Sequence, residues 1–209
     1  MRNTYSSQIA RIDGKNVFVE VLNGAFSIGK LQMNFIEYDE QTNKQTKKLD
    51  LYIDALLAVS LAERILNGEF QRYVAEVKTS GKATQWTSYF TDMGGISEDK
   101  VAAKFDEFAE KYPFLKKGDA ISRQLKVQTG NKYPWVLRAE YGPGKSSDKG
   151  LIVPNGNPPM VINIPMDDDS LRKIAVAIKY SYQAYLNQYY NKFSDKLFPN
   201  DKVNLFTAN

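Results

Sequence analysis

The chain has 209 residues, of which 43% are hydrophobic and 25% are charged, and its net charge is +4. These values are ordinary for a folded protein and exclude a disordered chain. No apolar run reaches the roughly 18 residues that a membrane-spanning helix needs, so we expect no membrane contact and a cytoplasmic location. The sequence contains no cysteine and no histidine, which excludes disulfides, thiolate or imidazole metal ligands, and Ser-His or Cys-His catalytic pairs.

The first third of the chain predicts an antiparallel sheet followed by one helix. Alternating apolar residues predict strands at 8–12, 16–22, 25–38 and 49–53. Asn23-Gly24 is typical of a two-residue hairpin, and Gly29 indicates a bend or bulge. Asp54 is placed to cap a helix whose apolar residues recur at helical spacing over 56–66, and Asn67-Gly68 is placed to end it.

The middle of the chain predicts more strands and one inserted helix. Residues 70–78 and 84–90 alternate and predict a hairpin, with a turn between them at 79–81. A helix is predicted from Ser97 up to Pro113, because the residue before a proline avoids the helical region. A strand over 120–128 follows.

The stretch from Lys132 to Lys145 predicts another strand and a turn. Trp135, Leu137 and Ala139 alternate with Val136, Arg138 and Glu140, which is the period of a strand with one packed and one wetted face. Gly142-Pro143-Gly144 then predicts a turn. Short strands are expected at 151–153 and 160–164, separated by a turn over 154–159.

A long helix from Leu171 to about residue 198 is the last predicted element, with a tail over 199–209. Asp167, Asp168 and Asp169 are placed to cap it and to favour the positive end of its dipole. A metal site is the alternative for this triplet, but no further ligands at calcium-loop spacing accompany it. The half over 180–193 is rich in tyrosine, and two interpretations fit it: packing against the sheet, or an oligomer interface. We expect a homo-oligomer through this helix.

Strands followed by an acid-capped helix occur twice, over residues 15–67 and 69–198. The pattern therefore predicts an α+β fold with two antiparallel four-stranded sheets, each followed by a helix, and a long C-terminal helix. Both halves are expected in a single domain.

The excess positive charge lies in one segment. Residues 116–149 hold eight basic and three acidic side chains, whereas the rest of the chain holds 20 basic and 21 acidic ones. Aromatic side chains alternate with these cations, and an unpaired base is a flat ring attached to a charged phosphate, so the mixture suits single-stranded nucleic acid. A solvated basic face without a ligand is the plainer alternative.

The candidate binding residues combine these cations with aromatic rings from the predicted strands. Trp86 and Trp135 fit a core position as well as a stacking one, because large aromatic residues on alternating strands usually face inward. The candidates are Lys30, Lys78, Lys82, Trp86, Tyr89, Lys132, Tyr133, Trp135, Arg138, Tyr141, Lys145 and Lys149.

Three stretches resemble a known fold family. The strand over 135–144, the strand over 149–153 and the strand-plus-helix over 161–178 resemble the strand–strand–helix ending of the Whirly and related transcriptional-coactivator folds. The resemblance implies two four-stranded sheets with helices and single-stranded-DNA binding across the sheets. Phage and bacterial single-strand-binding proteins share this fold, so it also implies a role in DNA replication or recombination, in a host cytoplasm if the protein is phage-encoded.

We therefore expect a sequence-tolerant single-stranded-DNA-binding protein that is not an enzyme and needs no cofactor or metal. RNA remains an alternative ligand. A nuclease or recombinase subunit is a second hypothesis, with Asp92, Glu98 and Asp99 as its carboxylates, although their positions also suit helix capping. A third is an assembly protein that does not bind nucleic acid.

Overall fold

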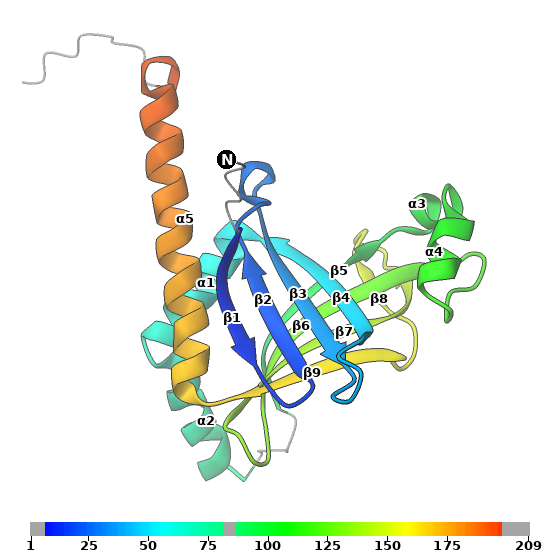
Figure 1. The fold of residues 1–209 in the computed structure, drawn as a ribbon, viewed down its shortest axis with the longest axis horizontal. Coiled ribbons are helices and arrows are strands. Elements are labelled where there is room, and N and C mark those ends of the chain that lie inside the picture. The colour runs from blue at the N-terminus through cyan, green and yellow to red at the C-terminus, as the bar shows by residue number, and fades with distance from the viewer. Residues whose placement is uncertain (1–6, 82–86, 198–209) are drawn as a thin grey trace, which may run out of the picture.

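Two antiparallel sheets lie across each other in a computed structural model that describes residues 7–81 and 87–197 (Figure 1). Sheet A has the order β1 (Gln8–Asp13), β2 (Val17–Leu22), β3 (Lys30–Tyr38) and β4 (Gln45–Asp54). Sheet B has the order β5 (Ser88–Ile96), β6 (Ala120–Thr129), β7 (Trp135–Ser146) and β8 (Ile152–Pro154), and β9 (Met160–Met166) pairs with β7 beside β8. The α+β class with two antiparallel sheets and a long final helix is as predicted, except that sheet B has five strands.

Helix α1 (Ala55–Leu66) begins and ends where the sequence predicts. One carboxylate oxygen of Asp54 accepts from the backbone N–H groups of Leu56 and Leu57 at 3.0 and 3.1 Å, and Gly68 follows the helix with a φ of 71°. The predicted two-residue hairpin at Asn23-Gly24 is wrong. A longer loop with a short 3-10 helix, η1 (Phe26–Ile28), joins β2 to β3 there, and Gly29 makes the bend with a φ of 69°.

The predicted strand over 70–78 is wrong, because this segment is helix α2 (Glu69–Thr79). Phe70, Val74 and Val77 are spaced four and three apart, so they also fit one face of a helix. Phe70 is buried and the two valines are half-buried in the structure. Over so short a run, the pattern of apolar residues therefore did not distinguish the period of a strand from the period of a helix.

The inserted helix predicted from Ser97 to Pro113 is two short helices, α3 (Glu98–Ala102) and α4 (Phe105–Lys111). The break falls at Ala103 and Lys104, and Lys104 has φ and ψ of −139° and 38°, outside the helical region. Both helices lie at the end of the sheets opposite to α1 (Figure 1).

The turn predicted at Gly142-Pro143-Gly144 is also wrong, because β7 runs straight through it. A Cβ at Gly142 would lie 2.9 Å from Cα of Pro158, so glycine here permits a loop to pack onto the sheet. Pro143 lies between the last residue paired with β9 and the first paired with β8, and its carbonyl accepts from N–H of Asn155 at 2.8 Å. The N–H and C=O of one residue in an antiparallel strand point to the same side, so the position of the missing N–H of Pro143 also faces the β8 side. The proline therefore removes no hydrogen bond between β7 and β6.

The hydrophobic core lies between the inner faces of the two sheets, and α1 and α5 (Asp168–Leu197) close it at one end (Figure 1). A cavity of only about 20 Å³ remains between sheets and helices, so the core is closely packed. It is lined by Met33, Ile53, Leu61, Ala62, Ile65, Leu125, Val127, Leu137, Leu171, Ile174 and Ile178.

The 30 residues of α5 correspond to about 45 Å, and its second half extends beyond the body of the protein (Figure 1). Phe26 of η1 packs against Tyr182 and Tyr185, with ring centroids 5.1 and 5.5 Å apart, at the point where the helix leaves the body. Within residues 7–81 and 87–197, no helix combines the length and the apolar content needed to cross a lipid bilayer.

Candidate nucleic-acid interface

Trp135 faces the core and is only 2% exposed. Its ring lies 6.0 Å from that of Phe70 and 5.8 Å from that of Tyr89, and its Nε1–H donates to a carboxylate oxygen of Asp168 at 2.7 Å. The side chain thus joins β7 to α2, β5 and the first turn of α5. The prediction that Trp135 stacks on a base is corrected, because a ring so enclosed presents no face to a ligand.

Tyr141 and Tyr89 are corrected in the same way, since they are 1% and 7% exposed. The Tyr141 hydroxyl donates to the backbone carbonyl of Asp50 in sheet A, and burial raises its pKa. Burial likewise raises the pKa of Tyr89, whose ring lies edge-on to that of Tyr73. The strand alternation was predicted correctly, but the aromatic members of the alternation belong to the packed face.

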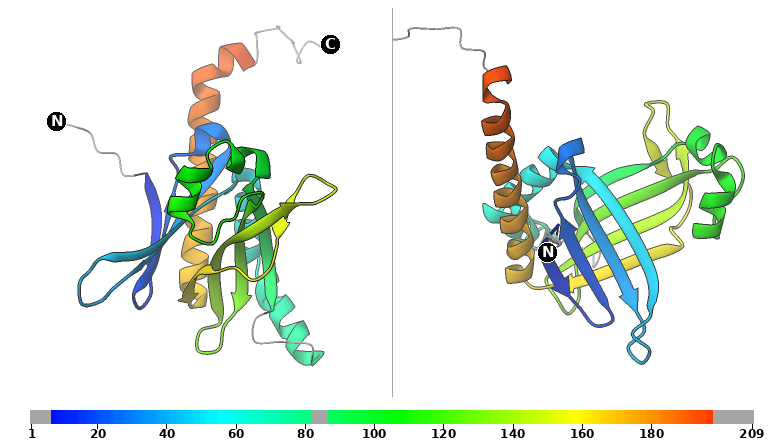
Figure 2. Two further views of the ribbon diagram at one scale, coloured as in Figure 1. Left: turned by 90° about the vertical axis from the view of Figure 1, so that its right-hand side faces the viewer. Right: turned by 45° about the horizontal axis from the view of Figure 1, so that its top comes forward.

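The other face of sheet B is polar, and the helices gather at the two ends of the sheets instead of lying over it (Figure 2). We call this surface the outer face of sheet B. Strand alternation and register give its central members as Gln124, Lys126, Gln128, Val136, Arg138, Glu140, Val161 and Asn163. The loop between β8 and β9 packs onto the part of this face around Gly142 of β7, where Pro158 covers the glycine.

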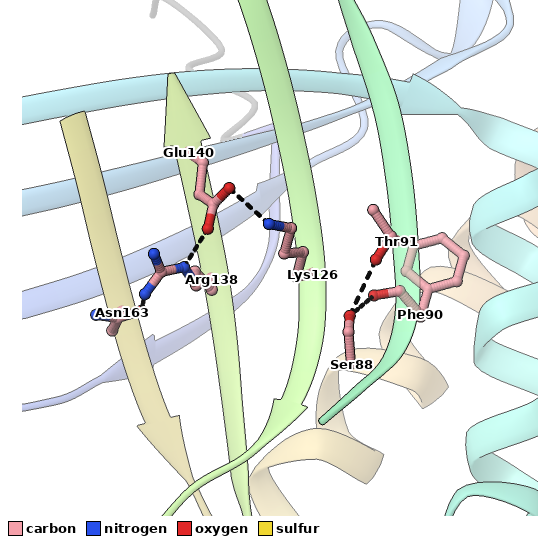
Figure 3. Close-up of polar contacts among 7 residues, drawn as sticks. All are labelled: Ser88, Phe90, Thr91, Lys126, Arg138, Glu140 and Asn163. Carbon is pink, nitrogen blue, oxygen red and sulfur yellow. Dashed lines mark hydrogen bonds and ion pairs between the residues drawn. The ribbon is translucent and has the colours of Figure 1, made fainter. Parts of the chain in front are cut away.

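Four side chains form a continuous row across the middle of this face, from β6 through β7 to β9 (Figure 3). Lys126 Nζ lies 2.7 Å from one carboxylate oxygen of Glu140, Arg138 Nε donates to the other, and Arg138 Nη1 lies 3.4 Å from the amide oxygen of Asn163. Burial alone would raise the pKa of Glu140, but the hydrogen bonds from Lys126 and Arg138 outweigh it and hold that pKa below its ordinary value. Glu140 is therefore an anion at neutral pH.

The remaining basic candidates of this region lie at the two ends of β7. Lys132 and Tyr133 are exposed in the β6–β7 loop, and Lys145 and Lys149 are exposed in the β7–β8 hairpin. The 12 residues of β7 correspond to about 40 Å. The predicted cations therefore form a line along β7 and not a compact cluster.

The other candidates do not join this line. Lys30 lies in sheet A, 3.7 Å from a carboxylate oxygen of Asp54, and Lys78 lies on α2, the segment predicted as a strand. Lys82 and Trp86 lie outside the described residues.

The sequence reasoning missed the outer face of sheet A, where cations and rings are also neighbours. The Arg11 guanidinium lies 3.7 Å from the ring centroid of Phe18, and Phe18 lies 6.1 Å from Tyr38 on the adjacent strand. Alternation within β1, β2 and β3, combined with their antiparallel pairing, was the signal that could have found it.

Charge distinguishes the two outer faces. Sheet A carries three cations (Arg11, Lys30 and Lys48) and four anions (Asp13, Glu20, Asp50 and Asp54), and each cation lies within 4.0 Å of an anion. The strands of the outer face of sheet B carry two cations (Lys126 and Arg138) and one anion (Glu140), and the loops at the two ends of β7 add Lys132 and Lys149 against Asp148. Sheet B is the face suited to a polyanion.

Two members of the aspartate triplet, Asp167 and Asp168, have structural contacts. Asp167 accepts from the backbone N–H of Ser170 at 2.7 Å as the N-cap of α5, and Asp168 accepts from Trp135. Hydrogen bonds from Ser170 hold the pKa of Asp167 below its ordinary value. Among the described residues, no three acidic side chains are grouped so that they could hold a metal ion.

Comparison of the chain with protein-family models, with curated proteins and with solved structures finds no match.

Proposed function

We propose that the protein binds single-stranded DNA, without strong sequence preference, along the outer face of sheet B. The observation that supports this most directly is a line of four cations that follows β7, from Lys132 in the loop at one end, through Lys126 and Arg138 on the outer face, to Lys149 in the hairpin at the other end. The helices of the described residues lie at the ends of the sheets and not over this face. A flexible single strand can follow such a line, whereas a rigid duplex is far less able to conform to it. A Whirly-like arrangement, a role in replication or recombination, and a cytoplasmic location in a phage-infected host are parts of the same proposal.

The burial of Trp135, Tyr89 and Tyr141 changes how such binding would be achieved. Tyr133, 42% exposed, is the one ring among the described candidates that is available for stacking. Phosphate contacts then supply most of the affinity, which makes binding strongly dependent on salt. Four contacts to a single strand give a slope of log K against log salt of up to about −2.8.

We also propose that the protein self-associates through the second half of α5. The 12 residues from Tyr180 to Asn191 include no charged side chain, although a quarter of the whole chain is charged. Tyr180, Tyr189 and Tyr190 are 59%, 42% and 46% exposed. An uncharged surface of tyrosine and amide groups fits a second copy of itself, because no like charges oppose each other across a two-fold axis.

The test measures binding of a fluorescent dT oligonucleotide and of a duplex of equal length by anisotropy, at two salt concentrations, with and without EDTA. We expect single strands to bind more tightly than duplex, with affinity that falls with salt and is unchanged by EDTA. Replacing both Lys132 and Lys149 with alanine should weaken binding at least tenfold and flatten the salt slope by about 1.4.

The matched control replaces two exposed lysines that lie away from the outer face of sheet B, Lys78 on α2 and Lys100 on α3. This variant loses the same charge, so equal weakening by both variants would contradict binding along β7. Equal affinity for duplex and single strand would contradict the proposed function itself. A requirement for divalent metal would favour the nuclease hypothesis, and no binding at all would favour the assembly protein.

A further inference from the structure

The row in the middle of sheet B contains an anion already bound by two cations. Glu140 has a side-chain exposure of 6%, whereas Lys126 and Arg138 have 22% and 23%. Its two carboxylate oxygens are shared between the cations, one oxygen each, as two phosphate oxygens would be. The carboxylate is thus much less exposed than the two cations that it binds.

We propose that Glu140 is an internal competitor for the DNA backbone: it holds Lys126 and Arg138 in the unbound protein, and a backbone phosphate draws at least one of them away when a strand binds. This inference rests on the proposed function. It identifies Glu140 as the residue that limits affinity at the centre of the face, and it predicts that Lys126 and Arg138 contribute less to binding than Lys132 and Lys149, the exposed lysines at the two ends of β7.

The surroundings of the row determine which partner moves. Glu140, Gly142 and Pro158 line one small enclosed space, so the carboxylate is covered by the β8–β9 loop on one side. Lys126 and Arg138 have long side chains whose charged ends are partly exposed. These charged groups can turn toward a ligand while the aliphatic part of each side chain stays packed on the sheet. The cations therefore exchange partners, and the carboxylate stays in place.

Asn163 supports the same interpretation from the next strand. Arg138 directs Nη1 to the Asn163 amide oxygen, so the guanidinium has one charged and one neutral acceptor. A neutral acceptor holds Arg138 in position across β7 and β9 without neutralising it. A second carboxylate at this position would compete further with phosphate.

The experiment compares two substitutions of opposite expected effect. Glu140→Gln keeps the size and the acceptor oxygen but removes the charge, and it should bind a dT oligonucleotide about tenfold more tightly, with a salt slope about 0.7 steeper. Asn163→Asp adds a carboxylate beside Arg138 and should bind about tenfold more weakly. Affinity is measured by anisotropy at the two salt concentrations used above, and circular dichroism with a thermal melt verifies folding.

Glu20→Gln is the matched control. Glu20 lies 3.7 Å from Arg11 on the outer face of sheet A, so this variant makes the same change in net charge on the opposite side of the protein. We expect its affinity to remain within twofold of the unsubstituted chain. Equal gains from Glu20→Gln and Glu140→Gln would reduce the effect to net charge and overturn the inference.

Unchanged or weaker binding by folded Glu140→Gln would also overturn it. If Glu140→Gln does not fold, Asn163→Asp decides the matter, since unchanged affinity in that variant contradicts competition at Arg138. These outcomes differ from failure of the proposed function, in which the unsubstituted protein itself shows no preference for single strands.

Discussion

Neighbouring residues at the start of β7 and in the loop before it have opposite environments, although the sequence places them within a few positions of each other. Tyr133 and Lys132 are exposed in a loop, whereas Trp135 is enclosed between Phe70 and Tyr89. The indole N–H has a partner in Asp168, which is the usual condition for burying a tryptophan. The large rings of this region therefore stabilise the fold, and the cations lie on the surface.

A pair of substitutions separates these two roles. Trp135→Phe removes the indole hydrogen bond and part of the packing, so the free energy of unfolding should fall by about 1–3 kcal/mol while DNA affinity at 20 °C stays within twofold. Tyr133→Ala should leave the melting temperature almost unchanged and weaken single-strand binding by about tenfold or more, since a base stack contributes about 1–3 kcal/mol. Thermal melts and anisotropy measure both. Weaker binding by Trp135→Phe with no loss of stability would restore a stacking role to Trp135.

Helix α5 has two halves in different surroundings. The first half packs against α1, where Lys179 pairs with Glu63 at 2.9 Å, and the second half extends beyond the sheets. The Glu63 carboxylate raises the pKa of Lys179, which keeps this exposed pair charged. The uncharged residues begin immediately after Lys179.

This change along α5 leads to a prediction at the level of the element. Replacing both Tyr180 and Tyr190 with lysine brings like charges together in a self-associated pair and should weaken association by at least about tenfold. Light scattering after gel filtration should show a larger mass for the unsubstituted protein than for the variant. Tyr52→Lys, at an equally exposed tyrosine on sheet A, is the control and should keep the larger mass. Equal masses for all three proteins would contradict self-association through α5.

The two sheets meet around a half-buried carboxyl on the inner face of β5. Asp92 is paired in register with Leu125, and burial raises its pKa; Lys30 opposes this shift and Asp54 adds to it. Both of these side chains belong to sheet A. A group whose pKa is higher in the folded than in the unfolded chain contributes stability below its unfolded pKa of about 3.9, and that contribution is lost as pH rises through the folded pKa.

Asp92→Asn should therefore stabilise the whole protein at neutral pH. We expect a melting temperature about 2–4 °C higher at pH 7, with a difference that shrinks as the pH falls through the raised pKa of Asp92, because protonation removes the charge that burial disfavours. Calorimetric melts between pH 4 and pH 8 measure this effect. Asp106→Asn, at an exposed position on α4, is the control. A constant difference over this range would mean that titration of Asp92 is not its cause.

The sequence by itself determined most of the elements, because they depend on neighbours along the chain. Alternation located each of the nine strands in the described residues closely or in part, although it also predicted a strand at 70–78 that is a helix, and the capping aspartates at positions 54 and 167 correctly marked the starts of α1 and α5. The charge count also identified the segment that became β6, β7 and their hairpins. These properties need only local hydrogen bonding and the period of each element.

Only the tertiary structure decided which face of β7 meets the core. Alternation places Trp135 and Tyr141 on one face of the strand and Arg138 and Glu140 on the other, but it does not say which face is buried. An aromatic ring can pack in a core or stack on a base. The interior between two sheets and two helices must be filled by large side chains, because protein cores are closely packed. The aromatic rings therefore lie inside, and the cations lie on the surface. The same requirement made residues 69–79 a helix, where Phe70 reaches Trp135, and continued β7 through Gly142, where Pro158 needs the space of a missing Cβ.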